Sequence, residues 1–260
     1  MPFLDVDALR LFRFESLNGF DVTHALLTRV GGVSPPPWHS LNVGGGVGDD
    51  LARVVANRLR AFAALGCDPE SIHDVWQVHS AEVVRADAPR AGAPLVRADA
   101  MVTDRPGVTL FMRFADCVPI LLVDPRRRAI GLAHAGWLGT VRKTAAAAVR
   151  ALIQAYGSRA RDLWAGIGPS IAAHHYPVGE EVAEQVRQVF GAEARRHLLE
   201  REGRVHFDLW SANRALLEAE GVGTVEVAGL CTACDTQAWY SHRAEGGRTG
   251  RFGALLGLEG

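Results

Sequence analysis

The sequence predicts an α+β fold with mostly antiparallel sheets, because its strand-like segments come in close pairs and its helical segments in separate blocks. Regular alternation of strands and helices would instead indicate a parallel, doubly wound sheet. The 260 residues fit one large domain, and neither an internal repeat nor a low-complexity linker divides the chain. We therefore expect a single domain that spans residues 1–260.

One predicted helix lies among the strands of the first half of the chain. Residues 21–28 alternate between apolar and polar side chains, which predicts a strand. A glycine-rich loop at 44–48 then leads into the helical run 51–65. Asp49 and Asp50 precede that run as N-cap candidates, and their charge would repel a phosphate at the helix N-terminus. We therefore interpret the glycines as a flexible wall of a site.

Further elements follow as a hairpin and as blocks of helix. Residues 98–104 and 108–114 flank a turn at Arg105-Pro106-Gly107, which predicts a hairpin that leads directly into Cys117. The remaining segments predict helices at 140–156, 179–190 and 208–220, with Asp208 as an N-cap, and strands at 163–167 and 224–228. These blocks of helix favour an α+β fold.

A central hairpin places two metal-ligand side chains together. Its strands, 118–123 and 128–133, are joined by a turn that starts with Asp124-Pro125, and these two residues suit a type I turn. If the hairpin is symmetric about the middle of its four-residue turn, Cys117 lies opposite His134. Directly opposed residues point to the same face, with Cβ atoms about 4.5–5.5 Å apart. We therefore expect a thiol and an imidazole to converge at the open end of the hairpin.

His79 is the candidate for a third ligand, because it interrupts the apolar segment 75–84. A Cys-His-His set matches catalytic zinc sites, which leave a fourth position to water or substrate. Copper is also possible, since affinity rises toward Cu²⁺ among divalent metals. The alternative is that Cys117 is a small buried apolar residue and His134 a hydrogen-bonded core histidine. If a metal is bound, three ligands instead of four argue against a purely structural ion.

Short motifs along most of the chain resemble one known family. In order, they are Thr28-Arg29-Val30-Gly31-Gly32-Val33-Ser34, Ser40-Leu41-Asn42, Val47-Gly48-Asp49-Asp50, Gln77-Val78-His79, residues 98–104, Ala115-Asp116-Cys117, His134-Ala135-Gly136-Trp137, Ile167-Gly168-Pro169-Ser170, residues 208–214 and residues 231–235. The ordered series resembles the YfiH/YlmD family, whose members are also described as laccase domain-containing or polyphenol-oxidase-like proteins and as peptidoglycan editing factors. The resemblance implies an α/β/β/α layered sandwich and a zinc site at His79, Cys117 and His134.

The resemblance also implies an activity on purine nucleosides. It implies phosphorolysis of adenosine, inosine and methylthioadenosine and deamination of adenosine, so the expected partners are a nucleoside and phosphate. Other members are described as copper-dependent phenol oxidases, or as editing factors that remove wrongly incorporated residues from cell-wall precursors. A multicopper oxidase needs many histidines, commonly as His-x-His pairs, and the ten histidines of this chain include no such pair. A zinc-stabilised binding module without catalysis is a further alternative.

Several polar or aromatic side chains become site candidates through the resemblance. Cys117 and Asp116 are the catalytic candidates, with Asp116 as the nearest carboxylate for proton transfer. Gln77 precedes His79 by two residues, so both would lie on the same face of a strand. The candidates for substrate binding are Arg29, Asn42, Gln77, Trp137, Arg142 and Arg251. Of these, Trp137 has an aromatic ring that could stack on a purine.

The chain departs from the family pattern at two places. Leu138 stands where the family usually has Arg after His-Ala-Gly-Trp, and Arg142 could supply the missing cation because residues four apart share a helix face. His174 and His175 stand where the family often has a Cys pair. Adjacent residues of a strand point to opposite faces, so we do not expect these two histidines in the metal site.

Charge and hydropathy exclude several classes of function. A net charge of −1 and a pI near 6.8 give no field that would steer the protein onto nucleic acid or an anionic membrane. The N-terminus lacks the pattern of a secretory signal, and no apolar run approaches the ~18 residues of a membrane span. We therefore expect a cytoplasmic protein that acts on a small molecule, with its oligomeric state left open.

Four cysteines are too few for a disulfide framework in a chain of this length. Two of them, Cys231 and Cys234, form a CxxC pair that could be a redox pair or half of a structural zinc site. The first possibility needs a thioredoxin-like context and the second needs another close pair of ligands, and the sequence indicates neither. We therefore interpret this pair as part of a packed turn.

Overall fold

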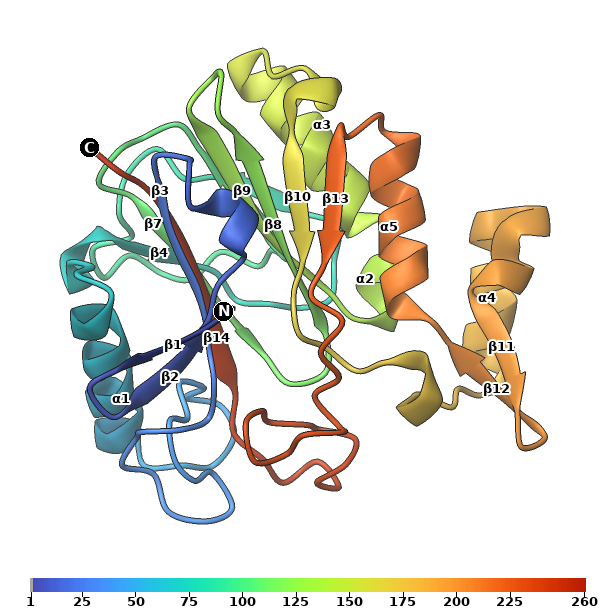
Figure 1. Ribbon diagram of the computed structural model, residues 1–260, viewed down its shortest axis with the longest axis horizontal. Helices are drawn as coiled ribbons and strands as arrows, with labels where there is room; N and C mark the ends of the chain where they lie inside the picture. Colours follow the sequence, from blue (N-terminus) through green and yellow to red (C-terminus); the bar gives the residue numbers. More distant parts are fainter. Residues whose placement is uncertain (1) are drawn as a thin grey trace.

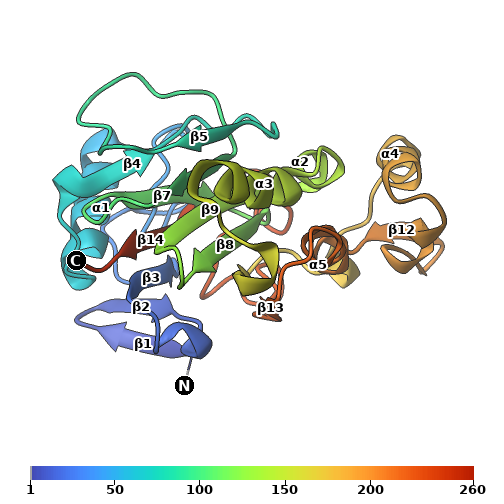
Figure 2. The same ribbon diagram turned by 90° about the horizontal axis from the view of Figure 1, so that it is seen from above.

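Two β-sheets packed face to face form the centre of the molecule, and helices cover both outer faces (Figures 1 and 2). The computed structural model describes residues 2–260. Most neighbouring strands are antiparallel, whereas β4–β7, β5–β6 and β10–β13 are parallel pairs. The predicted α+β fold, an α/β/β/α layered sandwich with mostly antiparallel sheets, is therefore confirmed.

The first sheet has the strand order β1-β2-β3-β14-β7-β4. Its strands are β1 (Phe3–Val6), β2 (Leu9–Phe12), β3 (Val22–Leu27), β14 (Phe252–Leu258), β7 (Thr109–Phe114) and β4 (Ile72–Asp74). Helix α1 (Leu51–Ala64) packs on its outer face, and the side chain of Asp50 accepts a hydrogen bond from the backbone N–H of Ala52 as the predicted N-cap. The last strand of the chain, β14, lies in the middle of this sheet, between β3 and β7.

The second sheet has the strand order β13-β10-β8-β9-β6-β5. Its strands are β13 (Thr224–Val227), β10 (Trp164–Ile167), β8 (Val118–Asp124), β9 (Ala129–Ala135), β6 (Ala100–Thr103) and β5 (Val83–Arg85). Its outer face is covered by α2 (Trp137–Val141), α3 (Thr144–Tyr156) and α5 (Leu209–Ala219). The Asp208 side chain accepts from the N–H groups of Trp210 and Ser211, so this predicted N-cap is also confirmed.

Three buried apolar clusters correspond to the three interfaces between layers. One includes Phe114, Leu121 and Phe252 and fills the space between the two sheets. A second joins α3 and α5 to the second sheet, and a third joins α1 to the first sheet through Phe62 and Phe111. Apolar burial contributes on the order of 25 cal/mol per Å², so these interfaces hold the two sheets in a fixed relation.

A small unit lies to one side of the layers (Figures 1 and 2). It consists of α4 (Glu180–Phe190), which the sequence predicted, and the hairpin of β11 (Leu198–Arg201) and β12 (Arg204–Phe207), which it did not. Short 3₁₀ helices complete the chain: η1 (Glu15–Leu17), η2 (Pro69–Ser71), η3 (Ala160–Asp162), η4 (Ala173–His175) and η5 (Gly191–Arg196). The single-domain organisation stays a prediction.

The predicted hairpin of 98–114 is wrong. Both strands form, but β6 belongs to the second sheet and β7 to the first. Each pairs with a strand of its own layer, β6 with β9 and β7 with β14. Both strands are largely buried, as expected of strands that neighbouring layers cover on both faces. Residues 104–108 therefore cross from one sheet to the other.

The predicted helix 140–156 is broken into α2 and α3. Lys143 has φ of 63°, in the left-handed region, and this ends the first helical segment. The hydroxyl of Thr144 donates to the carbonyl of Gly139 and to that of Ser80. The break therefore ties the start of α3 to the segment that carries His79. Gly157 ends α3 with φ of 67°, as glycine does after a helix.

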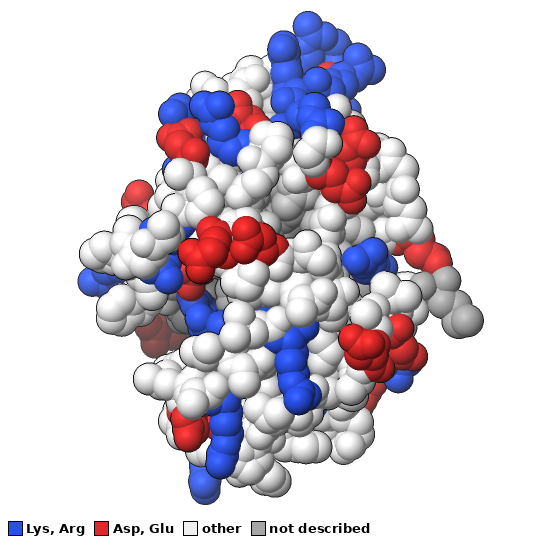
Figure 3. Space-filling view, turned by 90° about the vertical axis from the view of Figure 1, so that its left-hand side faces the viewer, with Lys and Arg blue, Asp and Glu red and all other residues white. Residues whose placement is uncertain are grey.

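The surface agrees with the near-zero net charge. On the face seen in Figure 3, basic and acidic side chains lie in separate small groups among uncharged residues. Within residues 2–260, none of the helices combines the length and the hydropathy that a membrane span requires.

Candidate metal centre and cleft

The β8–β9 hairpin has a register that differs by two residues from the predicted one. His134 pairs with Pro119, and Val118 pairs with Ala135, so Cys117 lies next to Gly136. The difference arises at the turn, because Asp124 stays in the strand. Its carboxylate accepts hydrogen bonds from the backbone N–H groups of turn residues 126 and 127. An even shift keeps the face of every side chain, so Cys117 and His134 still converge.

Three side chains meet at the end of this hairpin, as predicted. The ligand atoms of His79, Cys117 and His134 all lie within 4.8 Å of one another. The sulfur of Cys117 is 3.9 Å from Nε2 of His79, and the rings of His79 and His134 are 4.9 Å apart between centroids. His134 is buried, Cys117 is half-buried and His79 is exposed, so the cluster opens to solvent on the His79 side.

Gly136 makes room for the thiol. A Cβ placed on Gly136 would lie 2.6 Å from the sulfur of Cys117 and 3.4 Å from Cδ2 of His79. A real Cβ does not approach another atom as closely as 2.6 Å. Any larger residue at this position would therefore force the Cys117 sulfur to move.

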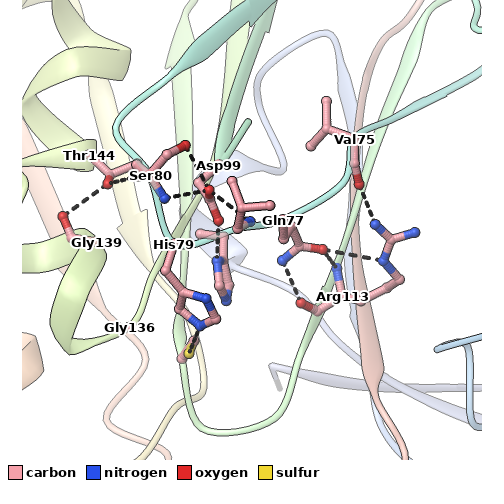
Figure 4. Close-up of polar contacts among 12 residues, drawn as sticks. Val75, Gln77, His79, Ser80, Asp99, Arg113, Gly136, Gly139 and Thr144 are labelled. Atoms are coloured by element: carbon pink, nitrogen blue, oxygen red, sulfur yellow. Dashed lines mark hydrogen bonds and ion pairs between the residues drawn. The ribbon is translucent and has the colours of Figure 1, made fainter. Parts of the chain in front are cut away.

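His79 is carried by a loop, which corrects the prediction that Gln77 and His79 share one face of a strand. Residues 77–79 lie between β4 and β5 in neither strand, and His79 has φ of 58°. This loop is held by polar contacts (Figure 4). A carboxylate oxygen of Asp99 accepts from the N–H groups of Val78 and Ser80, and the Arg142 guanidinium donates to the carbonyl of His79 at 2.7 Å.

Asp99 also orients His134. Its Oδ1 lies 2.8 Å from Nδ1 of His134 and its side chain is fully buried. Burial alone would raise the pKa of Asp99, but hydrogen bonds from His134, Ser80 and Val78 hold this pKa below its usual range. The ionised carboxylate accepts a hydrogen bond from Nδ1–H, so a neutral His134 ring presents Nε2 to a metal. A carboxylate behind a ligating histidine is a common feature of zinc sites.

The thiol and the imidazole favour each other's charged forms. Burial would raise the pKa of Cys117, but His134 and His79 lower this pKa. Burial would lower the pKa of His134, and Cys117 and Asp99 instead raise it. Thiolate is the form of cysteine that binds metals.

The donor set and its surroundings fit a zinc ion. Zinc prefers thiolate sulfur and imidazole nitrogen, and three protein ligands leave one position for substrate or water. His79, Cys117 and His134 line a cleft of about 760 Å³, within the usual range of small-molecule sites. The glycine loop 44–46 also lines it, as expected of a site wall.

The same cleft contains a group of arginines that the sequence analysis missed. Arg113 donates to Asp74 at 3.0 Å and to the carbonyl of Val75, and Arg90 donates to Asp74 at 2.6 Å. Arg58 lies beside them, and burial together with Arg113 lowers the pKa of Arg58 to about 10. These residues come from α1, β4, β7 and a loop, so no spacing in the sequence links them. With one carboxylate among three guanidinium groups, this part of the cleft is positively charged.

Two of the predicted substrate-binding residues line the cleft. The Gln77 amide accepts from and donates to the backbone of Arg113 (Figure 4), and Arg251 lies at the start of β14. Asn42 is fully buried and fixes the backbone of the cleft wall. Its Oδ1 accepts hydrogen bonds from the N–H groups of Gly44 and Arg251. Asn42 thereby positions two parts of the wall.

The other predicted residues do not line the cleft. The Arg29 guanidinium binds His39 and Thr236 carbonyls and Glu245, and Trp137 packs against the core beneath α3. Arg142 is exposed, and its guanidinium donates to the backbone carbonyl of His79. The Asp116 carboxylate accepts from the Thr232 hydroxyl and the Arg243 N–H and is buried. Asp116, with φ of 80°, therefore shapes the turn before Cys117.

Comparisons with known proteins agree with this fold. Residues 23–259 match the family model described as multi-copper polyphenol oxidoreductase laccase. A purine nucleoside phosphorylase of Deinococcus radiodurans is 44% identical over 91% of this chain and 89% of its own length, and purine nucleoside phosphorylase YlmD of Bacillus subtilis is 33% identical over 93% and 90%.

Solved structures extend the likeness to three dimensions. YfiH of Bacillus licheniformis superposes with a TM-score of 0.91 at 35% identity over 99% of both chains. YlmD of Geobacillus stearothermophilus superposes with a TM-score of 0.93 at 32% identity over 100% of this chain and 99% of its own. The chain thus belongs to the laccase-like family that this model describes and that includes YfiH and YlmD.

Proposed function

We propose that this protein is a zinc-dependent purine nucleoside phosphorylase that acts on adenosine, inosine and methylthioadenosine and that also deaminates adenosine. The observation that carries the proposal is the placement of the His79, Cys117 and His134 side chains in one cleft with Arg58, Arg90, Arg113 and Arg251. Relatives at 33% and 44% identity carry the name purine nucleoside phosphorylase, which supports this choice of reaction.

Phosphorolysis needs a site for a doubly charged anion next to a site for a sugar. A phosphate oxygen forms a bond to C1′ of the ribose, the bond from C1′ to the base breaks, and the base takes up a proton as it leaves. The arginines supply the positive charge that would bind and orient the phosphate, at about 1.5–3 kcal/mol for a charge-assisted hydrogen bond. When bound, zinc supplies Lewis-acid charge that stabilises developing negative charge on an oxygen.

The cleft also offers an apolar surface for the base. Trp76 and Leu95 line it and are 61% and 39% exposed, which is unusual for large apolar side chains. An exposed indole beside polar groups is suited to stacking on a purine ring. We therefore place the base against Trp76, whereas the sequence had indicated Trp137.

The same binding mode accommodates deamination, in which water replaces the exocyclic amine of adenosine and ammonia leaves. That reaction uses no phosphate, so it should not depend on the arginines that bind the anion. Gln77 lines the cleft, where hydrogen bonds to the backbone of Arg113 fix its amide, and we assign it contact with a polar group of the nucleoside.

The test is product analysis with the zinc-loaded protein. Inosine with phosphate should give hypoxanthine and ribose 1-phosphate, and adenosine without phosphate should give inosine. Both should disappear in Cys117→Ala, which should also lose the zinc of this centre, whereas Cys67→Ala serves as a control because Cys67 lies outside the metal cluster. A folded protein with zinc at this centre that releases no base in the presence of phosphate would contradict the proposal.

Copper-dependent phenol oxidation is the second candidate, because the matching family model carries that description. One Cys-His-His centre can hold a single copper ion. Electron transfer through a multicopper cluster needs more histidines than this centre provides. Any phenol oxidation should therefore follow added copper and be slow, and fast oxidation by a copper-free, zinc-loaded preparation would overturn this view.

A further inference from the structure

A second cluster of metal-ligand side chains lies outside the cleft. The ligand atoms of His174, His175, Cys231 and Cys234 all lie within 4.8 Å of one another. None of the four lines the cleft that holds His79, Cys117 and His134. We propose that these two histidines and two cysteines bind a second metal ion, a zinc ion with a structural role.

The fold brings the four residues together through two parallel strands. β10 and β13 are parallel neighbours, and their pairing ends with Ile167 opposite Val227. The segments that follow stay side by side, because Ser170 forms a β-bridge with Cys231. The CxxC pair therefore lies beside η4, which carries both histidines.

The local conformation explains why the sequence analysis set these histidines apart. Adjacent residues of a strand point to opposite faces, but His174 and His175 lie in a 3₁₀ turn. Their rings are 4.6 Å apart between centroids, so they face the same region. The prediction that they point apart is wrong, and the second close pair that the CxxC needed is present.

The chemistry of the set is that of a closed zinc site. Two thiolates and two imidazoles make a Cys₂His₂ set, which binds zinc tetrahedrally and leaves no open position. Nε2 of His174 lies 3.0 Å from the sulfur of Cys234. With zinc–sulfur and zinc–nitrogen bonds of about 2.3 and 2.0–2.1 Å, ligand atoms sit roughly 3.3–3.8 Å apart, so small side-chain movements would suffice.

Backbone hydrogen bonds hold the CxxC segment in place. The N–H of Ala172 donates to the sulfur of Cys231 at 3.3 Å, which orients that sulfur. The N–H of Cys234 donates to the carbonyl of Cys231, which keeps the CxxC turn compact. Both cysteines are free thiols, so no disulfide competes for their sulfur atoms.

A metal ion at this second cluster would stabilise the segment that carries Cys117 of the first centre. The N–H of Ile171 donates to the carbonyl of Asp116, and the Thr232 hydroxyl donates to its carboxylate at 2.7 Å. Each of these contacts comes from one of the two segments that the ion would join. Asp116 directly precedes Cys117, so the ion would fix the turn from which that thiol projects.

The first test is metal content of the intact protein, purified under reducing conditions with zinc. The wild type should contain two zinc ions per chain, one for each cluster. Cys234→Ser and His79→Ala should each contain one, and Cys67→Ser, the matched control outside both clusters, should contain two. A wild type with one zinc ion that Cys234→Ser retains and His79→Ala loses would overturn the proposal.

A second test uses the wild type alone, in case a variant does not fold. A thiol-alkylating reagent followed by mass spectrometry should leave Cys234, the exposed cysteine of the pair, unmodified in the zinc-loaded protein and modify it after a chelator is added. Modification without chelator would overturn the proposal. Protection that a chelator leaves intact and a reductant removes would also overturn it, because it would identify a disulfide.

The outcome is independent of the proposed reaction. If the second zinc is present and no nucleoside is cleaved, the proposed function is contradicted and the proposed second zinc site is supported. If nucleosides are cleaved with a single zinc ion at the first centre, the second zinc site is contradicted and the proposed function is supported.

Discussion

Oδ1 of Asp99 lies 2.8 Å from Nδ1 of His134, and the other oxygen of the same carboxylate holds the loop that carries His79. One buried side chain thus orients one candidate ligand directly and positions a second through the backbone. This relation makes Asp99, a residue that touches neither the thiol nor the cleft, a key element of the centre.

Asp99→Asn should weaken zinc binding at the first centre by roughly ten- to a hundredfold, because the outer partner of a ligating histidine sets its tautomer and orientation. Competition with a chromophoric chelator measures the change. Asp87→Asn, at an exposed carboxylate paired with Arg85, is the matched control and should bind zinc like the wild type. Unchanged affinity in Asp99→Asn would show that His134 is oriented by other contacts.

Gly136→Ala should also impair the centre, because the new Cβ would lie 2.6 Å from the Cys117 sulfur. The thiol must then move, so we expect weaker zinc binding with little change in circular dichroism. Gly46→Ala, in the wall of the same cleft where a Cβ meets nothing within 4 Å, is the control. Full zinc affinity in Gly136→Ala would mean that the sulfur has another place to go.

Counting paired positions outward from the turn could predict that Cys117 and His134 meet. It could not predict the register of their hairpin. Strand parity is insensitive to an even shift, so the two side chains share a face in either register. The turn residue Asp124 decides between the registers by capping two backbone N–H groups from within the strand. A turn of four residues can do this in several ways, and the sequence alone does not select one.

The positions of His79 and of the arginines could not be predicted in the same way. His79 is placed by Asp99 and Arg142, which are distant in sequence, and the arginines gather around Asp74 from separate elements. Hydrophobic periodicity reports the buried face of an element, and these side chains come from a helix, a strand and loops that share no periodic pattern. His79 stood out in the sequence only because it interrupts the apolar segment 75–84 and belongs to a motif shared with the family.

His24 should make the stability of the fold depend on pH. Burial, with a contribution from Arg13, lowers the pKa of His24 from 6.5 to about 4. Its Nε2 accepts from the N–H of Phe14 at 3.0 Å, which needs the neutral ring. Between these pH values the unfolded chain binds a proton that the folded chain does not. The contribution of His24 to the free energy of unfolding therefore has its full value above pH 6.5 and falls as the pH drops toward 4.

The contribution of His24 is at most about 3 kcal/mol, at about 1.36 kcal/mol for each pKa unit. Urea unfolding at pH 7 and pH 5 measures it. His24→Gln should be less stable than the wild type at pH 7 but should lose less stability between the two pH values. An identical loss in both proteins would assign the acid sensitivity to other groups.

Arg142→Ala should lower zinc affinity and both nucleoside reactions together. The Arg142 guanidinium donates to the carbonyl of His79 and does not line the cleft, so its removal frees the His79 loop. Zinc titration and the kinetics of phosphorolysis and deamination check this outcome. A raised KM for phosphate with normal zinc binding and normal deamination would instead show that Arg142 supplies the cation that the family pattern led us to expect at the position of Leu138.

Arg251 is a better candidate for the phosphate cation. It lines the cleft, its backbone is held by Asn42, and burial lowers the pKa of its guanidinium. Loss of a charge-assisted hydrogen bond costs on the order of 1.5–3 kcal/mol, and 1.4 kcal/mol is a factor of ten. Arg251→Gln should therefore weaken phosphorolysis roughly ten- to a hundredfold, mainly through KM for phosphate.

The control for this variant is Arg248→Gln, at an exposed arginine of the same segment that does not line the cleft. It should behave like the wild type in both reactions. Deamination by Arg251→Gln should change little, because that reaction uses no phosphate. Equal loss of phosphorolysis and deamination in Arg251→Gln would mean that Arg251 supports the nucleoside pocket. If Arg251→Gln keeps full activity in both reactions, the phosphate must be bound by the arginines around Asp74. Their guanidinium groups are then the only strong cations of the described cleft.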